Sequence, residues 1–261
     1  MTNDELSGPL IPKSNSTIDD SQRTAAKVAG FSCLFSMAIV VFANYALYSP
    51  LIVPGNAAET ARNIVAHETQ LRITVTCFLT YSASVIVLLT ALYVILKPVN
   101  QGLALVGAFF RLVFALLWLL TALNLLGALR LLGTASYLQV FEADRLHALA
   151  RAHLGANFDD YYVGLPFFGL AAAVCSYLWL QSNYIPKSLS IFGLISSAWC
   201  VVCAFVFLIF PNFNKTVNDY WFDSPMGLFE LVLSFWLLFK GLRPPGIAEP
   251  ALAGASIAVY T

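Results

Sequence analysis

The sequence predicts an all-α polytopic membrane protein, a bundle of six transmembrane helices with short interfacial helices in the outer loops. Hydrophobic residues make up 59% of its 261 residues and charged residues only 11%, against roughly 25% charged in soluble domains. Backbone amides in a bilayer core must be satisfied within the segment, and a spanning helix needs about 20 apolar residues. Six stretches meet that length: Val28–Tyr48, Ile73–Leu96, Leu103–Leu129, Tyr161–Leu180, Ser188–Phe210 and Trp221–Phe239.

The segment before the first span, residues 1–27, is polar and contains four acidic residues. It lacks the basic start of a cleaved signal peptide, so we expect a cytoplasmic N-terminal segment followed by a retained span. Residues 28–243 are then the six-helix transmembrane domain. The tail, residues 244–261, is rich in Pro, Ala and Gly and is expected to be disordered.

The loops indicate the orientation. The two shortest, Lys97–Gly102 and Gln181–Lys187, each carry one Lys beside a span, and they share a face with both termini. Seven basic residues lie near span ends on that face and six on the other. Basic residues concentrate on the cytoplasmic side of membrane proteins. We therefore expect an integral membrane protein with both termini in the cytoplasm.

Two helices are expected in the longer outer loops. In the first of these loops, Asn56 and Glu59 have the spacing of a capping box, so a helix over residues 57–67 should follow. Apolar residues from Leu138 to Ala150 fall near helical spacing and predict a second helix over 142–154. This helix either lies on the membrane surface or packs over the mouth of the bundle.

Six short stretches have a distinctive sequence: Leu51–Glu59, Leu96–Asn100, Ala108–Leu112, Gly164–Leu170, Tyr184–Lys187 and Leu237–Gly241. In these stretches the chain resembles a bacterial membrane family known as domain of unknown function 4386, over about Arg23 to Arg243. The resemblance implies a multi-spanning protein of unassigned activity in a bacterial cytoplasmic membrane. The family's fourth span often has a His where this chain has Ala171, so chemistry built on that His is not expected in this chain.

Arg111 and Glu230 are the main candidate site residues. Each is flanked on both sides by apolar residues inside a predicted span. A charge deep in a membrane costs roughly 3 kcal/mol or more, and it usually faces the bundle interior and finds a partner. Both residues are expected about 12–15 Å from the cytoplasmic side at roughly 1.5 Å per residue, so a direct pair is feasible. A proton, ion or anion site and a structural ion pair both fit.

Other titratable residues point less clearly to chemistry. Cys200 and Cys203 form a C-x-x-C pair inside a span, but no loop contains a partner Cys pair. His147 lies in an outer loop near Asp144, a conceivable metal site for which solvated polar residues are the simpler interpretation. We expect no metal and no cofactor. Asp160, Tyr161 and Tyr162 could line an outer vestibule, or the tyrosines could belong to an interfacial belt.

Three function classes remain open. The first is a non-enzymatic membrane protein that binds a partner or lipid or supports assembly, which fits the lack of catalytic motifs. The second is a translocator of a small solute, ion or proton that uses Arg111 and Glu230. The third is a membrane redox enzyme. With 14 basic and 14 acidic residues, the chain has no basic excess for nucleic acid, so the expected partners are the lipid bilayer and another membrane protein.

Overall fold

The computed structural model describes residues 18–210, 213 and 220–244. Most of the expected N-terminal segment (1–27) and almost all of the expected tail (244–261) lie outside this part of the chain. The boundaries proposed for those two segments therefore stay predictions.

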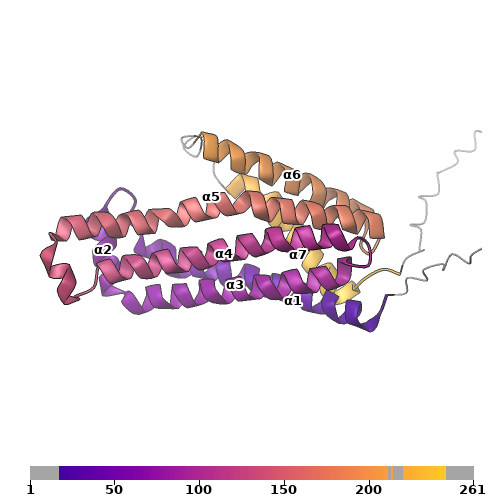
Figure 1. Cartoon of the computed structure of the whole chain (residues 1–261), viewed down its shortest axis with the longest axis horizontal. Helices are drawn as coiled ribbons and strands as arrows, with labels where there is room; N and C mark the ends of the chain where they lie inside the picture. The colour runs from indigo at the N-terminus through magenta and orange to yellow at the C-terminus, as the bar shows by residue number, and fades with distance from the viewer. Residues whose placement is uncertain (1–17, 211–212, 214–219, 245–261) are drawn as a thin grey trace, which may run out of the picture.

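The described residues form an all-α bundle, as predicted (Figure 1). Six helical segments are long and apolar enough to cross a membrane, which confirms the polytopic fold class. The first segment is α1 (Asp20–Val41), which is continued by the π-helical segment η1 (Phe42–Tyr48) and the turn η2 (Ser49–Leu51). The next four are α3 (Glu68–Leu96), α4 (Gln101–Leu131), α5 (Ala143–Ser182) and α6 (Lys187–Ile209). The sixth is α7 (Tyr220–Phe235), which is continued by the π-helical segment η5 (Trp236–Lys240).

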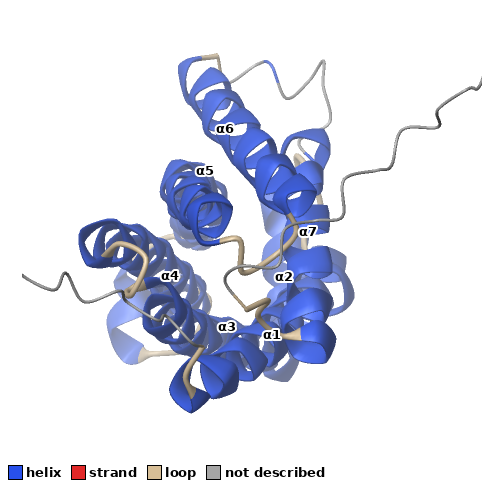
Figure 2. Ribbon diagram, turned by 90° about the vertical axis from the view of Figure 1, so that its right-hand side faces the viewer, coloured by secondary structure: helices blue, strands red, loops and turns tan. Residues whose placement is uncertain are grey.

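The helices alternate in direction along the long axis (Figure 1). We call the end with the short helix α2 (Ala57–Ala66) and the α4–α5 connection the loop end. The opposite end, where α1 begins and η5 ends, is the termini end. Viewed along the bundle, α1, α3, α4, α5 and α7 form an arc around a central axis, and α6 lies outside against α5 and α7 (Figure 2).

The first of the two predicted loop helices forms as expected. Asn56 precedes α2, and its side-chain oxygen accepts a hydrogen bond from the Glu59 backbone N–H at 3.0 Å. The Glu59 carboxylate in turn accepts from the Asn56 amide at 3.1 Å. The first of these bonds satisfies a backbone donor at the open N-terminus of a short helix, which is why the sequence signal located it well.

The second predicted loop helix is not separate from the fourth span. Residues 143–182 form one continuous helix, α5, because nothing between Gly155 and Tyr161 interrupts it. At roughly 1.5 Å per residue, a helix of 40 residues is about 60 Å long, twice the hydrocarbon thickness. Ala150 and Leu154 are each 1% exposed against the bundle core. The first part of α5 therefore packs over the bundle rather than lying on the membrane surface.

Small residues bring the helices close together. A side chain at Gly169 would meet Val201 of α6 at 2.6 Å, and one at Gly193 would meet the Phe229 ring of α7 at 2.4 Å. At both positions any residue larger than glycine requires the facing side chain to move. Such contacts replace the hydrophobic driving force that membrane helices lack, and they fix α6 against both α5 and α7.

Candidate functional site

The structure brings Arg111 and Glu230 into direct contact. Arg111 extends from α4 and Glu230 from α7, and Arg111 Nη2 lies 2.8 Å from Glu230 Oε1. Only 4% of Arg111 and 8% of Glu230 is exposed. Charges buried this deeply in a membrane bundle are tolerated when they are paired. The pair therefore joins two helices that are distant in sequence and holds their charges in a neutral unit.

Further contacts fix the position of both side chains. The guanidinium of Arg111 lies 5.3 Å from the centre of the Phe168 ring on α5, within range of a cation–π interaction. Cys33 Sγ of α1 lies 4.0 Å from Glu230 Oε2. Arg111 Nε is buried and has no hydrogen-bond partner among the described residues. Four helices thus meet at the pair.

The ion pair forms one end of an intramembrane cavity of about 330 Å³. Residues from α1, η1, α3, α4, α5 and α7 line it, while α6 contributes none of the described lining. Asp223 and Glu230 mark its two ends on α7, about 10 Å apart at roughly 1.5 Å per residue. The lining includes seven aromatic side chains: Tyr45, Tyr81, Phe114, Trp118, Tyr161, Tyr162 and Phe168.

The loop end of the cavity is polar. The Tyr161 hydroxyl donates a 2.5 Å hydrogen bond to the Asp223 carboxylate. The rings of Tyr161 and Tyr162 are 5.6 Å apart at an angle of 65°, and the amide of Asn157 is one helical turn away on α5. Tyr161 and Tyr162 thus both line this cavity, and their role in an outer vestibule stays a prediction. Sequence reasoning missed Asp223, although an acid in the first turn of a predicted span is a usable signal.

Asp160 takes no part in this hollow. Adjacent residues of a helix point about 100° apart, so Asp160 faces α4 while Tyr161 faces the cavity. Its carboxylate accepts hydrogen bonds from Asn124 Nδ2 at 2.8 Å and from Thr121 Oγ1 at 3.2 Å. Asp160 is 9% exposed. The geometry gives it a role in joining α4 to α5, apart from the predicted vestibule.

The cavity opens sideways toward the loop end. At the termini end α1 and α7 are in contact, since a side chain at Gly30 would meet the Ser234 carbonyl at 2.7 Å. Nearer the loop end, Val41 and Tyr45 line the cavity and are each 54% exposed on the outside of the first span. Tyr45 lies in η1, and π-helical turns often occur at functional sites. The cavity is thus accessible from the lipid-facing side of the bundle.

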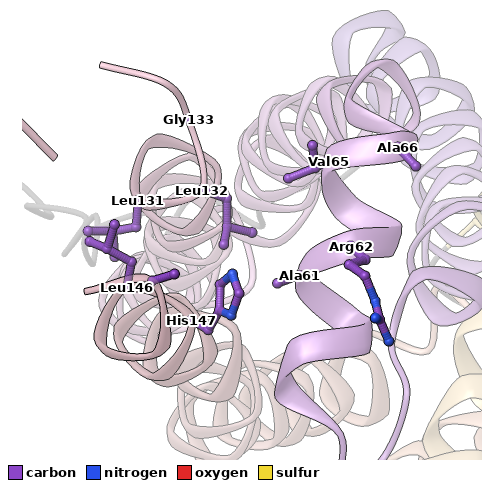
Figure 3. Close-up of a pocket in the computed structure, with 10 residues that line it drawn as sticks. Ala61, Arg62, Val65, Ala66, Leu131, Leu132, Gly133, Leu146 and His147 are labelled. Atoms are coloured by element: carbon purple, nitrogen blue, oxygen red, sulfur yellow. The ribbon is translucent and has the colours of Figure 1, made fainter. Parts of the chain in front are cut away.

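A second hollow of about 350 Å³ lies at the loop end between α2, the end of α4 and the start of α5 (Figure 3). Its lining is mostly apolar, with the His147 ring directed into it and Arg62 pointing away (Figure 3). The ring of His153, six residues further along α5, packs against Gly127 of α4. The residues that the structure describes contain no group of three metal-binding side chains.

The Cys200 and Cys203 pair is buried in α6. Both thiols are free, and Cys200 packs against Ala172, Ala204 and Met226. These surroundings are those of small hydrophobic residues. The structure therefore supplies no geometric support for the redox interpretation.

Comparison with known proteins shows the family. The model of the family described as Domain of unknown function (DUF4386) matches residues 28–241, so the chain belongs to this family. An uncharacterized protein of Archaeoglobus fulgidus is 25% identical over 153 residues, which cover 59% of this chain and 74% of that protein. No solved structure matches the chain. The family agrees with the resemblance noted in the sequence; a bacterial origin stays an expectation.

Proposed function

We propose that this member of the DUF4386 family is a non-enzymatic integral membrane protein that binds a lipid-like amphipathic molecule in its intramembrane cavity. The observation that carries the proposal is the sideways opening: Val41 and Tyr45 line the cavity and are each 54% exposed. A molecule dissolved in the bilayer could enter there without crossing water.

The lining suits an amphipathic ligand. Binding sites for small molecules are mostly apolar, with a few placed polar groups that fix orientation. Phe114, Trp118 and Phe168 supply apolar area near the ion pair, whereas Tyr161 and Asp223 supply hydrogen-bonding groups at the loop end. Aromatic rings also lose little conformational entropy when they order around a ligand. The cavity therefore offers one apolar region and one polar region to the same molecule.

The Arg111–Glu230 pair acts in this proposal as the closed end of the cavity. It holds α4 against α7 at 2.8 Å, which keeps the cavity wall in place. Its two charges neutralise each other, so they offer polarity without a net charge. We assign the pair a structural and positioning role rather than a catalytic one.

A glycine provides a direct test. A side chain added at Gly227, which lines the cavity, would meet no atom within 4 Å. That distance applies to the first side-chain atom, the Cβ, so a longer side chain can start from Gly227 without a clash. We expect Gly227→Phe to occupy the cavity, and a melting curve checks that the helices stay in place. Gly155 of α5 has equal space and does not line the cavity, so Gly155→Phe is the matched control.

The measurement is native mass spectrometry and lipid extraction of protein purified in mild detergent. We expect a bound amphipathic molecule in the native protein and in Gly155→Phe, and its loss in Gly227→Phe. Equal retention of the molecule by both variants would reject the cavity as the binding site. A co-purified protein with an empty cavity would favour partner binding instead, and a flavin, quinone or metal would favour a redox enzyme.

Translocation is the second candidate function. Arg111 lines the cavity on one side. On its other side, toward the termini end, it lines two small voids of about 20 and 10 Å³. The ion pair thus stands between the open cavity and internal space nearer the opposite membrane face. A flux assay in proteoliposomes tests this function: transport that Arg111→Met abolishes would support it, and no transport of protons, ions or small solutes would reject it.

For the membrane location, we propose the cytoplasmic membrane of a prokaryotic cell with both termini in the cytoplasm. The proposal is supported by the basic residues beside the short loops at the termini end, Lys97 and Lys187. The cavity then opens toward the outer leaflet.

A further inference from the structure

Two side-chain N–H groups inside the bundle have no hydrogen-bond partner among the residues that the structure describes. They are Arg111 Nε on α4 and Trp179 Nε1 on α5. Arg111 is 4% exposed and Trp179 is 0% exposed. A buried donor without an acceptor costs free energy, and native proteins leave few such groups unpaired. Both donors therefore call for an acceptor from outside the chain.

Arg111 and Trp179 line the same small void, which we call the inner void. It has a volume of about 20 Å³ and lies on the termini side of the ion pair. Side chains of a helix lean toward the N-terminus of that helix. Arg111 therefore leans toward the termini end, where α4 begins, and Trp179 leans toward the loop end, where α5 begins. The two side chains thus extend toward each other along the bundle axis.

The lining of the inner void selects the kind of molecule that fits there. An Arg guanidinium and a Trp indole can only donate hydrogen bonds, so the occupant must accept them. The Glu230 carboxylate lines the same void. Its Oε1 accepts from Arg111 Nη2 at 2.8 Å. Its Oε2 lies 4.0 Å from the Cys33 thiol, a weak donor, and has capacity for a further hydrogen bond.

Charge narrows the choice further. An anion in the inner void would be repelled by the Glu230 carboxylate, and the charge of Arg111 is already neutralised by that group. A cation would meet two N–H donors. A small neutral molecule that both accepts and donates hydrogen bonds satisfies all three side chains.

We propose that the inner void binds a water molecule that accepts from Arg111 Nε and Trp179 Nε1 and donates to Glu230 Oε2. A cavity needs roughly 10–15 Å³ to hold one water, which then makes about three hydrogen bonds. The inner void has this volume and these partners. The other small void, of about 10 Å³, is smaller and is lined mostly by apolar residues, so it should stay dry.

This inference goes beyond the proposed function, because it concerns the side of the ion pair away from the ligand cavity. The water joins α4, α5 and α7 through Arg111, Trp179 and Glu230. It also places a hydrogen-bonding molecule on the termini side of Glu230, which proton translocation, the second candidate function, requires.

Radiolytic labelling of the full chain in lipid nanodiscs tests for this water. An X-ray pulse splits water into hydroxyl radicals, which oxidise side chains beside a bound water even inside a protein. Cys33 lines the inner void, whereas Cys200 of α6 does not, and the two residues are 6% and 1% exposed. We expect mass spectrometry to show that Cys33 is oxidised several times faster than Cys200.

A pair of matched variants shows whether the oxidation comes from the inner void. Cys175→Val enlarges a side chain that lines this void, so the oxidation of Cys33 should fall to the level of Cys200. Cys203→Val makes the same change at a buried position that does not line it and should leave the oxidation of Cys33 unchanged. Melting curves check that both variants fold. Equal oxidation of Cys33 and Cys200 in the native protein, or fast oxidation of Cys33 that persists in folded Cys175→Val, would overturn the inference.

A second measurement needs no change in the volume of the void. The ultraviolet resonance Raman spectrum of the native protein minus that of Trp179→Phe contains the indole band of Trp179 that responds to hydrogen bonding. We expect this band at the position of a hydrogen-bonded indole N–H. A band at the position of a free indole N–H would overturn the inference.

Discussion

Arg111 and Glu230 are 119 residues apart in the sequence, and their side chains meet at 2.8 Å inside the bundle. Because each charge has the other as its partner, the removal of one leaves an uncompensated charge in a nonpolar environment. The pair therefore makes the positions of α4 and α7 interdependent. It also determines where the cavity ends, since both residues line it.

The first prediction concerns the energetic coupling of this pair. Arg111→Met and Glu230→Met should each lower the free energy of unfolding by about 3–5 kcal/mol, and the double variant should recover much of that loss. Unfolding in mixed detergent micelles measures the cycle. The exposed pair Arg72–Glu68, at 2.7 Å, is the control and should show coupling of about 0.5 kcal/mol or less. Strictly additive losses at Arg111 and Glu230 would mean that the two charges do not interact.

The second prediction concerns close helix packing. Gly193→Ala would place a methyl group 2.4 Å from the Phe229 ring and 2.6 Å from Ser176 Oγ, so we expect a loss of about 1–3 kcal/mol in unfolding free energy. Gly155→Ala meets no atom within 4 Å and should stabilise its helix by roughly 0.5–1 kcal/mol. Thermal melts of both variants in the same detergent test this contrast. A Gly193→Ala protein as stable as the native one would show that α7 does not pack there.

The third prediction concerns the α4–α5 contact at Asp160. Asp160→Leu leaves the Asn124 amide and the Thr121 hydroxyl without their acceptor, and we expect a loss of about 1–3 kcal/mol in unfolding free energy, measured by thermal melts. Asp160→Asn keeps an acceptor oxygen and should recover most of the stability. Asp159→Leu, at the exposed neighbouring position, is the control and should change little. If Asp160→Asn loses as much stability as Asp160→Leu, the negative charge of Asp160 matters more than its capacity to accept hydrogen bonds.

The fourth prediction concerns orientation. After replacement of the five native cysteines, a single Cys at Glu59 in α2 should react with an impermeant maleimide on intact cells. A single Cys at Asn100, in the short turn before α4, should react only after the membrane is permeabilised. Both sites are exposed, so access alone decides the result. Labelling of both from the same side would contradict a six-span topology, and the reversed pattern would place the termini outside.

The sequence predicts the spans well because bilayer thickness constrains length and composition together. The helix boundaries are less well predicted, because hydropathy carries no information on helix capping. For example, α1 begins at Asp20 because the Asp19 side chain accepts a hydrogen bond from the Gln22 backbone N–H at 2.6 Å. The continuity of α5 was not predicted, because hydropathy also does not show whether a helix ends between two segments or continues. The predicted span Tyr161–Leu180 places Pro166 near its start, whereas in the structure Pro166 lies well inside α5.

The candidate site can be predicted only in part from the sequence. Arg111 and Glu230 stand out because charges are rare in apolar segments. Asp160 and Tyr161 look equivalent in the sequence, but helix geometry turns one to α4 and the other to the cavity. The cavity itself depends on how five spans are arranged in space, and no local sequence pattern predicts that arrangement. The place of Asp223 in the site follows from its hydrogen bond with Tyr161, which the sequence does not show.

The proposed function depends above all on an amphipathic molecule in the intramembrane cavity. An electron cryomicroscopy map of the protein in native-lipid nanodiscs, with a bound antibody fragment to aid alignment, tests for that molecule most directly. We expect elongated density between Trp118 and Gly227 that extends from the Arg111–Glu230 pair toward Asp223 and is absent in Gly227→Phe. A map in which α1 and α7 close over this space, or in which it contains ordered water alone, would contradict the proposed function.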